Sequence, residues 1–145
     1  MSAGLVFAQF GLLAALAWQV YAKWPAIALG NMAAGLFAMS IALGLWTLTV
    51  NRPGNFNVIP EPKAGACLVT KGPCQWIRHP MYSSLLLLAA GLAWVINGWW
   101  AWYTWLMLAI VLWFKSVIEE RFLRDHFSGY TDYQTSTKRF IPFLF

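Results

Sequence analysis

The sequence predicts an all-α integral membrane protein with four transmembrane helices. Three observations carry this prediction: a composition too apolar for a water-soluble globule, four uncharged runs, and basic residues that gather on one side of those runs. Of the 145 residues, 60% are hydrophobic and only 10% are charged, whereas a soluble domain has about a quarter of its residues charged. So few charges cannot coat a folded chain of this size, so we expect lipid to be its main solvent.

The expected spans follow from the length needed to cross a bilayer, about 20 apolar helical residues for a core roughly 30 Å thick. Two uncharged runs, 3–22 and 26–50, are separated by Lys23, Trp24 and Pro25. A longer uncharged run begins at residue 80 and is too long for one crossing, and its Asn97-Gly98 turn signal divides it into spans at 81–96 and 99–118. A loop at 51–80 and a tail at 119–145 complete one membrane domain over 1–145.

The orientation follows from the distribution of Lys and Arg. With four crossings, nine of the ten basic residues lie on the side that holds both termini and the central loop, and only Lys23 lies opposite. Basic residues favour the cytoplasmic side, so we expect cytoplasmic N- and C-termini in a bacterial inner membrane. Tryptophans gather towards the opposite side, as in an aromatic belt. No basic residue precedes the first run, so we expect a span there and not a cleaved signal peptide.

The net charge of +5 does not indicate a nucleic-acid partner, because the basic residues punctuate apolar runs and form no dense stripe. We read them as contacts with the lipid bilayer. Gly30, Gly35 and Gly44 suggest close packing of the second span.

The first polar block, 68–84, is a candidate functional site, because a long ordered loop is usually functional. Gly72-Pro73 predicts a turn through which backbone can approach a ligand. Arg78-His79-Pro80 stands where the third helix begins, with Pro80 suited to its first turn. His79 is then expected beside exposed amides that attract an anion. The alternative is a water-facing helix cap.

The second block, 119–145, begins with Glu119 and Glu120 at the expected end of the fourth helix. Two acids there oppose the helix dipole, and ionisable groups at membrane depth tend to be functional. The alternative is a surface network in which Arg121 and Arg124 neutralise them. The tail beyond could anchor at the interface or fold over a ligand as a lid.

Other kinds of site find no support in the sequence. No spacing of His, Cys, Asp and Glu indicates a metal site, and no phosphate-binding loop, dinucleotide fingerprint or nucleophile elbow is present. Cys67 and Cys74 are expected to be reduced thiols.

The two blocks together resemble the isoprenylcysteine carboxyl methyltransferase family, whose superfamily includes the phospholipid methyltransferases. The central motif, roughly L-V-T-x-G-x-Y-x-x-x-R-H-P-x-Y, matches at Leu68, Val69, Thr70, Gly72, Arg78, His79, Pro80 and Tyr82. The tail motif matches at Glu119, Glu120, Leu123, Phe127, Tyr130, Tyr133, Arg139, Ile141 and Pro142. The chain departs from the pattern at Cys74, where the family usually has Tyr, and at Ser128-Gly129 and Thr137-Lys138.

This resemblance implies a membrane methyltransferase that uses S-adenosylmethionine, with a cytoplasmic cofactor site built from the central loop and the C-terminal segment. The residues implied for cofactor binding are Gly72, His79, Pro80, Tyr82, Glu119 and Glu120. Arg121 and Arg139 are candidates for orienting the acceptor in catalysis. The reaction needs alignment of nucleophile, methyl group and sulfur, together with exclusion of water.

The acceptor stays open at this stage. A lipophilic or small molecule with a carboxylate, amine or thiol fits a chain too short for a domain that binds protein substrates, and a lipophilic acceptor would arrive laterally between helices. The alternative is a non-enzymatic membrane subunit that retains the methyltransferase-like fold. A transporter is disfavoured, because the spans contain few polar midplane residues. The oligomeric state is not indicated.

Overall fold

The computed structural model describes residues 2–24, 29–51 and 67–142, which form a helical protein. The long helices are α1 (Ser2–Lys23), α2 (Asn31–Val50), α3 (Pro80–Ile96) and α4 (Trp99–His126). A single 3₁₀ turn, η2 (Gly72–Gln75), precedes α3, and a short helix, α5 (Tyr130–Ser136), follows α4. Within these ranges the extended backbone pairing is one isolated parallel bridge between Ile77 and Lys138.

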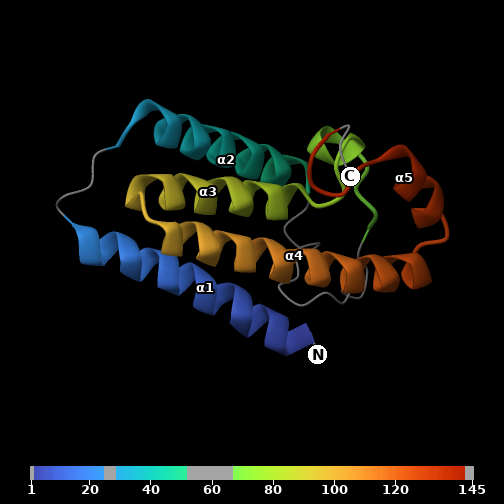
Figure 1. Ribbon diagram of the computed structural model, residues 1–145. Coiled ribbons are helices and arrows are strands. Elements are labelled where there is room, and N and C mark those ends of the chain that lie inside the picture. The colour runs from blue at the N-terminus through green and yellow to red at the C-terminus, as the bar shows by residue number, and fades with distance from the viewer. Residues whose placement is uncertain (1, 25–28, 52–66, 143–145) are drawn as a thin grey trace.

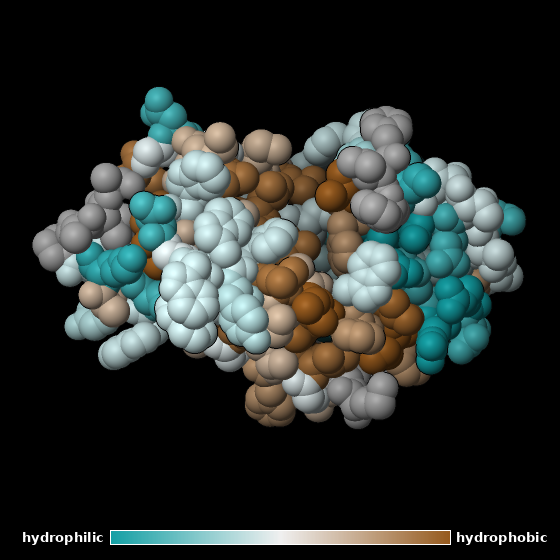
Figure 2. Space-filling view, viewed as in Figure 1, coloured by the Kyte–Doolittle hydropathy of each residue, from teal (hydrophilic) through white to brown (hydrophobic). Residues whose placement is uncertain are grey.

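The four long helices lie side by side in the order α2, α3, α4, α1, with α5 and the C-terminal residues at one end (Figure 1). Three of them, α1, α2 and α4, are long and apolar enough to cross a membrane. With 17 residues, α3 would reach only about 25 Å, so length alone does not make it a span. In Figure 2, hydrophilic residues occupy both ends of the visible face and brown apolar residues lie between them, as expected for a protein embedded in a bilayer.

Two of the expected helix boundaries are wrong. The fourth helix does not stop at residue 118 but continues to His126. Its 28 residues span about 42 Å, so the charged last turns extend beyond a hydrocarbon core about 30 Å thick. The second helix begins at Asn31, not at residue 26, because Gly30 takes an extended conformation as its N-cap. Residues 26–28, and 52–66 of the expected loop, lie outside the described residues. The short helices η2 and α5 were not predicted.

The turn between α3 and α4 brings the start of α3 and the end of α4 to the same end of the protein. Asn97 adopts a left-handed conformation with φ 48° and closes α3 with backbone hydrogen bonds to Ala93 and Trp94. Lys23 at the end of α1 donates from Nζ to the Ile96 carbonyl at 2.6 Å, a favourable place for a cation because helix C-termini are negative. The turn thereby places the two polar blocks at one end.

Close packing between α2 and α3 uses small residues, although not all of those expected. A Cβ on Gly91 would lie 2.5 Å from the Phe37 ring, and one on Gly44 would lie 3.0 Å from the Ser84 hydroxyl. Ser40 and Ser84 each donate to the other's carbonyl, at 2.8 and 2.9 Å. The prediction for Gly30 and Gly35 is wrong, because a Cβ on either would meet nothing within 4 Å. Both are exposed, Gly35 on α2 and Gly30 as the N-cap of that helix.

Gly72 fixes the turn that leads towards the site. Its φ is +61°, a conformation that L-residues with side chains rarely adopt. A Cβ there would also lie 2.6 Å from Val50 and 3.3 Å from the Trp46 indole nitrogen. Both constraints require glycine. Because Gly72 has no side chain, η2 can pack directly against the end of α2.

We therefore expect Gly72→Ala to lower the stability of the fold by about 1–3 kcal/mol, because it combines backbone strain with a steric clash. The measurement is thermal unfolding of the purified protein in detergent. Gly35→Ala is the matched control, since Gly35 is helical and open, and this change should leave the protein as stable or more stable. An unchanged melting temperature for Gly72→Ala would contradict the role assigned to this turn.

Candidate functional site

The Glu120 carboxylate is the centre of the site. It is only 1% exposed and accepts from four side chains. Arg78 Nε donates at 2.8 Å, Arg139 Nη2 at 2.7 Å and Gln134 Nε2 at 2.9 Å, while His79 Nε2 lies 3.2 Å from Oε1. A buried carboxylate is stable only when it is paired and hydrogen-bonded, and here two guanidinium groups, an imidazole and a carboxamide meet that requirement. Glu120 thus joins α4 to the loop before α3 and to the residues after α5.

The C-terminal segment, residues 137–142, lies across the start of α3. The Arg78 amide donates to the Lys138 carbonyl at 2.7 Å, and the His79 amide to the Arg139 carbonyl at 3.1 Å. Ser83 Oγ donates to the Phe140 carbonyl at 2.6 Å. His79 is the N-cap of α3 and Pro80 occupies its first turn, as predicted. The amides of Arg78 and His79 are occupied by these backbone partners, so neither is free to bind an anion.

Glu119 has different surroundings from Glu120, although the two are adjacent. Successive residues of an α-helix point about 100° apart, so Glu119 faces Tyr82 while Glu120 faces the C-terminal segment. Tyr82 Oη donates to Glu119 Oε2 at 2.8 Å, and His79 Nδ1 lies 3.7 Å from the same oxygen. The Glu119 side chain is 30% exposed. Its carboxylate is therefore more accessible than that of Glu120.

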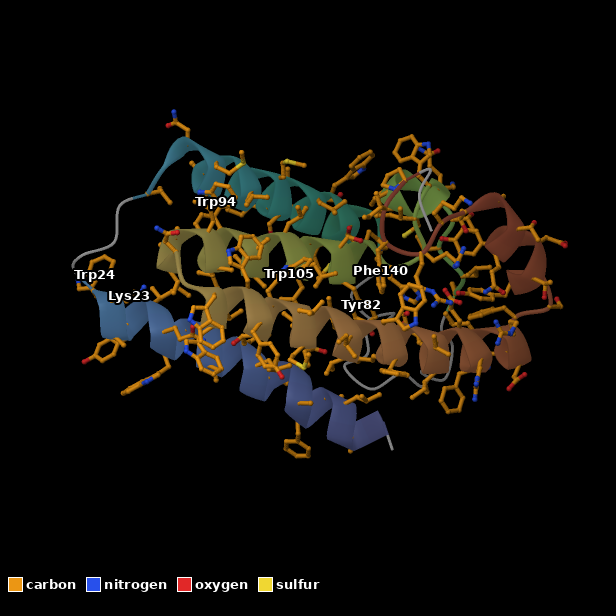
Figure 3. The ribbon with its side chains drawn as sticks, in the orientation of Figure 1. Lys23, Trp24, Tyr82, Trp94, Trp105 and Phe140 are labelled. Carbon is orange, nitrogen blue, oxygen red and sulfur yellow. The ribbon has the colours of Figure 1, made fainter. Side chains whose placement is uncertain are left out.

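Aromatic rings pack around these charges. The His79 and Tyr82 rings are stacked at 5.3 Å with an interplanar angle of 3°, and Phe140 lies 5.9 Å from His79 and 6.4 Å from Tyr82. Tyr82 and Phe140 lie together near the end of the bundle where the C-terminal residues fold back (Figure 3). The Arg139 guanidinium also sits over the Trp113 ring at 4.5 Å, a favourable cation–π contact. The rings limit access of water to the ion pairs.

Of the eight residues selected from the sequence, six lie together and two lie apart. The six are His79, Pro80, Tyr82, Glu119, Glu120 and Arg139. Gly72 lies against Val50 and Trp46 of α2. Arg121 is exposed on α4 and is not among the described partners of either glutamate. The next residue of a helix after Glu120 points away from it, so this arginine is not placed to neutralise the acids as the alternative reading required.

Several residues of the cluster were not selected from the sequence. Gln134 binds Glu120, and its carbonyl accepts from Arg78 at 3.1 Å. Arg78 also donates to the Thr137 carbonyl. These contacts depend on how α5 turns back towards α4, which has no local signal in the sequence. Lys115 did carry a signal, because it stands four residues before Glu119 and therefore on the same face of α4.

The thiol and phenols at the rim of the cluster are held in their protonated forms. Burial raises the pKa of the Cys74 thiol to about 11, so at neutral pH it is not a nucleophilic thiolate. Tyr133 Oη donates to the Cys74 carbonyl at 2.6 Å and ties α5 to η2. Burial also raises the pKa of the Tyr130 hydroxyl above its usual range. That hydroxyl is buried and has no hydrogen-bond partner among the described residues.

An apolar groove of about 810 Å³ adjoins the cluster. Side chains of α2 and α3 form its walls, Trp105 of α4 contributes to its lining, and η2 and the C-terminal segment close the end near the site. Ser83 and Phe140 belong both to this lining and to the surroundings of His79. A hydrophobic chain lying in the groove would therefore reach the charged cluster at one end.

Comparison with known families identifies the chain. The sequence model of a family described as phospholipid methyltransferase matches residues 30–129. The chain belongs to the phospholipid methyltransferase family. This match takes in α3 and most of the site, including both glutamates, and membership makes the protein a membrane methyltransferase in general terms. No curated protein matches the chain.

For this family member we expect Glu120→Gln to lower the free energy of unfolding by about 3–5 kcal/mol, because it leaves two arginines near one uncharged amide in a buried place. The measurement is thermal or denaturant unfolding in detergent. Asp125→Asn on the exposed side of α4 is the control and should change stability by less than about 0.5 kcal/mol. Equal stability of the two variants would show that the cluster does not hold the fold together.

Proposed function

We propose that the protein transfers a methyl group from S-adenosylmethionine to a lipophilic acceptor at the membrane surface. The single observation that carries the proposal is the position of the Glu119 carboxylate, partly exposed and oriented by Tyr82, in a cluster that adjoins an apolar groove. Membership of a methyltransferase family supports the reaction type. The polar cluster suits a water-soluble donor, and the groove suits an acceptor dissolved in lipid.

The residues present fit this donor. Its ammonium and ribose hydroxyls need a hydrogen-bond acceptor, which Glu119 supplies. The Tyr130 hydroxyl, buried and unpartnered among the described residues, is a further polar atom that a ligand can satisfy. We assign His79, Pro80 and Glu120 to holding the shape of the site, because His79 and Glu120 are already bound to each other. Gly72 supports the site through its turn.

When bound, S-adenosylmethionine supplies a methyl group on a positively charged sulfur. The protein's part is to hold the donor through Glu119, to keep that carboxylate in place through Tyr82, and to exclude water with the rings of Phe140 and Trp113. Arg139 stays in the proposed site as a group that orients the acceptor, since it lies over Trp113 beside Phe140. Arg121 is left out, because it is exposed and outside the cluster.

We also propose that α3 completes a fourth crossing, so that both termini face the cytoplasm of a bacterial cell. Its 17 residues are packed between α2 and α4 (Figure 1), and a short helix can be accommodated by such neighbours and by local thinning of the bilayer. The basic residues support this orientation. The donor then arrives from the cytoplasm and the acceptor arrives laterally from the membrane.

The first test is binding of S-adenosylhomocysteine, the demethylated donor, to detergent-purified protein by calorimetry. We expect saturable binding that Glu119→Gln weakens about tenfold or more, because a hydrogen bond to a charged group is worth about 1.5–3 kcal/mol. Asp125→Asn serves again as the control, since it removes an exposed carboxylate from the same helix.

The outcomes separate the two functions considered from the sequence. Absence of binding to a folded protein would reject the enzyme and favour a non-enzymatic membrane subunit. Binding that Glu119→Gln leaves unchanged would reject the assignment of Glu119 but not the enzyme.

The second test concerns the groove. Ala42 of α2 lines it, so Ala42→Phe should fill part of it and lower kcat/KM for a long-chain acceptor about tenfold, with binding of S-adenosylhomocysteine unchanged. The measurement is transfer of a labelled methyl group to membrane lipid extract. Ala14→Phe, on an exposed position of α1 away from the groove, should have little effect. Equal rates for both variants would place the acceptor elsewhere.

A further inference from the structure

Lys115 is a buried cation that has no role in the reaction proposed above. It is 2% exposed, and its Nζ donates to Gln9 Oε1 of α1 at 2.8 Å. The same ammonium lies 5.3 Å from the centroid of the Tyr82 ring. Lys115 stands one turn before Glu119, about 6 Å closer to the middle of the helix. A charged group at such a depth is costly and is usually functional.

Gln9 does not neutralise this lysine, because an amide carries no net charge. Within the described part of the chain, the charged side chains that are buried or half-buried are three cations and two anions. The anions are fewer by one even before a ligand is bound, and His79 can add only positive charge to the total. The cations are Arg78, Arg139 and Lys115, and the anions are Glu119 and Glu120.

Exposed charges nearby do not correct this balance. Arg121, Arg124 and Asp125 are all exposed on the last turns of α4, where water and salt screen them. Asp132 on α5 is exposed as well. The field inside the site is therefore set by the buried groups, for which the dielectric constant is lower and the Coulomb interaction stronger.

We propose that Lys115, held by Gln9, is a specificity-determining residue that selects an acceptor with an anionic nucleophile, a carboxylate or a thiolate, over an amine. This inference rests on the proposed function. S-adenosylmethionine carries a sulfonium, an ammonium and a carboxylate, so it adds one more positive charge to a site that already has an excess. An anionic acceptor lowers the excess, whereas a protonated amine raises it.

Methyl transfer to an anionic acceptor needs no additional acid or base from the protein. A lone pair of the carboxylate oxygen or thiolate sulfur forms a bond to the methyl carbon. The bond from carbon to the sulfonium sulfur breaks, and its electron pair stays on that sulfur, which becomes a neutral thioether. A carboxylate or a thiolate releases no proton in this step, whereas a neutral thiol first loses its proton to water and becomes the thiolate. An amine acceptor would need to lose a proton to a base, and Glu120, the innermost carboxylate, is already engaged by four donors.

The experiment compares three acceptors with the same ten-carbon chain: decanoate, decanethiol and decylamine. Labelled S-adenosylmethionine and the full chain in detergent are used at pH 8, and the methylated products are quantified separately. We expect the unmodified protein to methylate one or both of the first two with a higher kcat/KM than the amine. The separate arms then show whether the carboxylate or the thiol is the better nucleophile.

Two variants isolate the charge. The double variant Gln9→Leu with Lys115→Met replaces both partners by apolar side chains of similar size, so no buried polar group is left unpaired. It should lower the ratio of kcat/KM for the anionic acceptor to that for the amine by about tenfold. This is the effect expected when one unit charge that acts over several ångströms inside a protein is removed. Lys115→Arg keeps the charge and should keep the preference.

Each outcome is decisive. A preference for decylamine in the unmodified protein, or methylation of none of the three by protein that binds S-adenosylhomocysteine, would overturn the inference. Equal loss of activity towards all three acceptors in the double variant would show that Lys115 only supports the fold. Absence of S-adenosylhomocysteine binding would instead overturn the proposed function itself.

Discussion

The structure at this end of the protein depends on the burial of one carboxylate. Glu120 draws together side chains from the loop before α3, from α5 and from the residues that follow it, all of which must approach within hydrogen-bond distance. Two guanidinium groups converge on it, and each is itself held by aromatic or carbonyl partners. Because an ion pair in a low-dielectric place is stable only when complete, these segments must assemble together. The cofactor-facing geometry proposed for Glu119 is a consequence of this assembly.

The adjacent glutamates divide two tasks that a single residue could not perform. A carboxylate saturated by four donors has little capacity left for a ligand, and one that is open to a ligand cannot hold three segments together. Because the two side chains point about 100° apart on α4, Glu120 is buried and Glu119 lies beside Tyr82. The same helix continues past the apolar region, so both acids lie near the boundary at which that region ends. Lys115, one turn deeper, then adds a charge that neither task requires.

Much of this arrangement could be predicted from the sequence, and the failures have physical causes. Uncharged runs predicted all four long helices, and the Asn97-Gly98 pair predicted the turn that joins α3 to α4. The end of α4 was missed because the charged residues after 118 were read as a tail, although charge alone does not end a helix in water. The pairing of the Arg-His-Pro corner with the glutamates followed from the family motifs. The roles of Gln134 and of the backbone of residues 138–140 had no local signal, since they arise from contacts that only the folded chain creates.

One consequence concerns biosynthesis. The backbone bonds that Arg78 and His79 donate run to Lys138 and Arg139, which come after every long helix in the chain. The residues that complete the Glu120 cluster are therefore added only after all four long helices have been synthesised. Until then the nascent chain lacks two of the side chains that bind Glu120, Gln134 and Arg139, so the cluster can form only once the chain is almost complete.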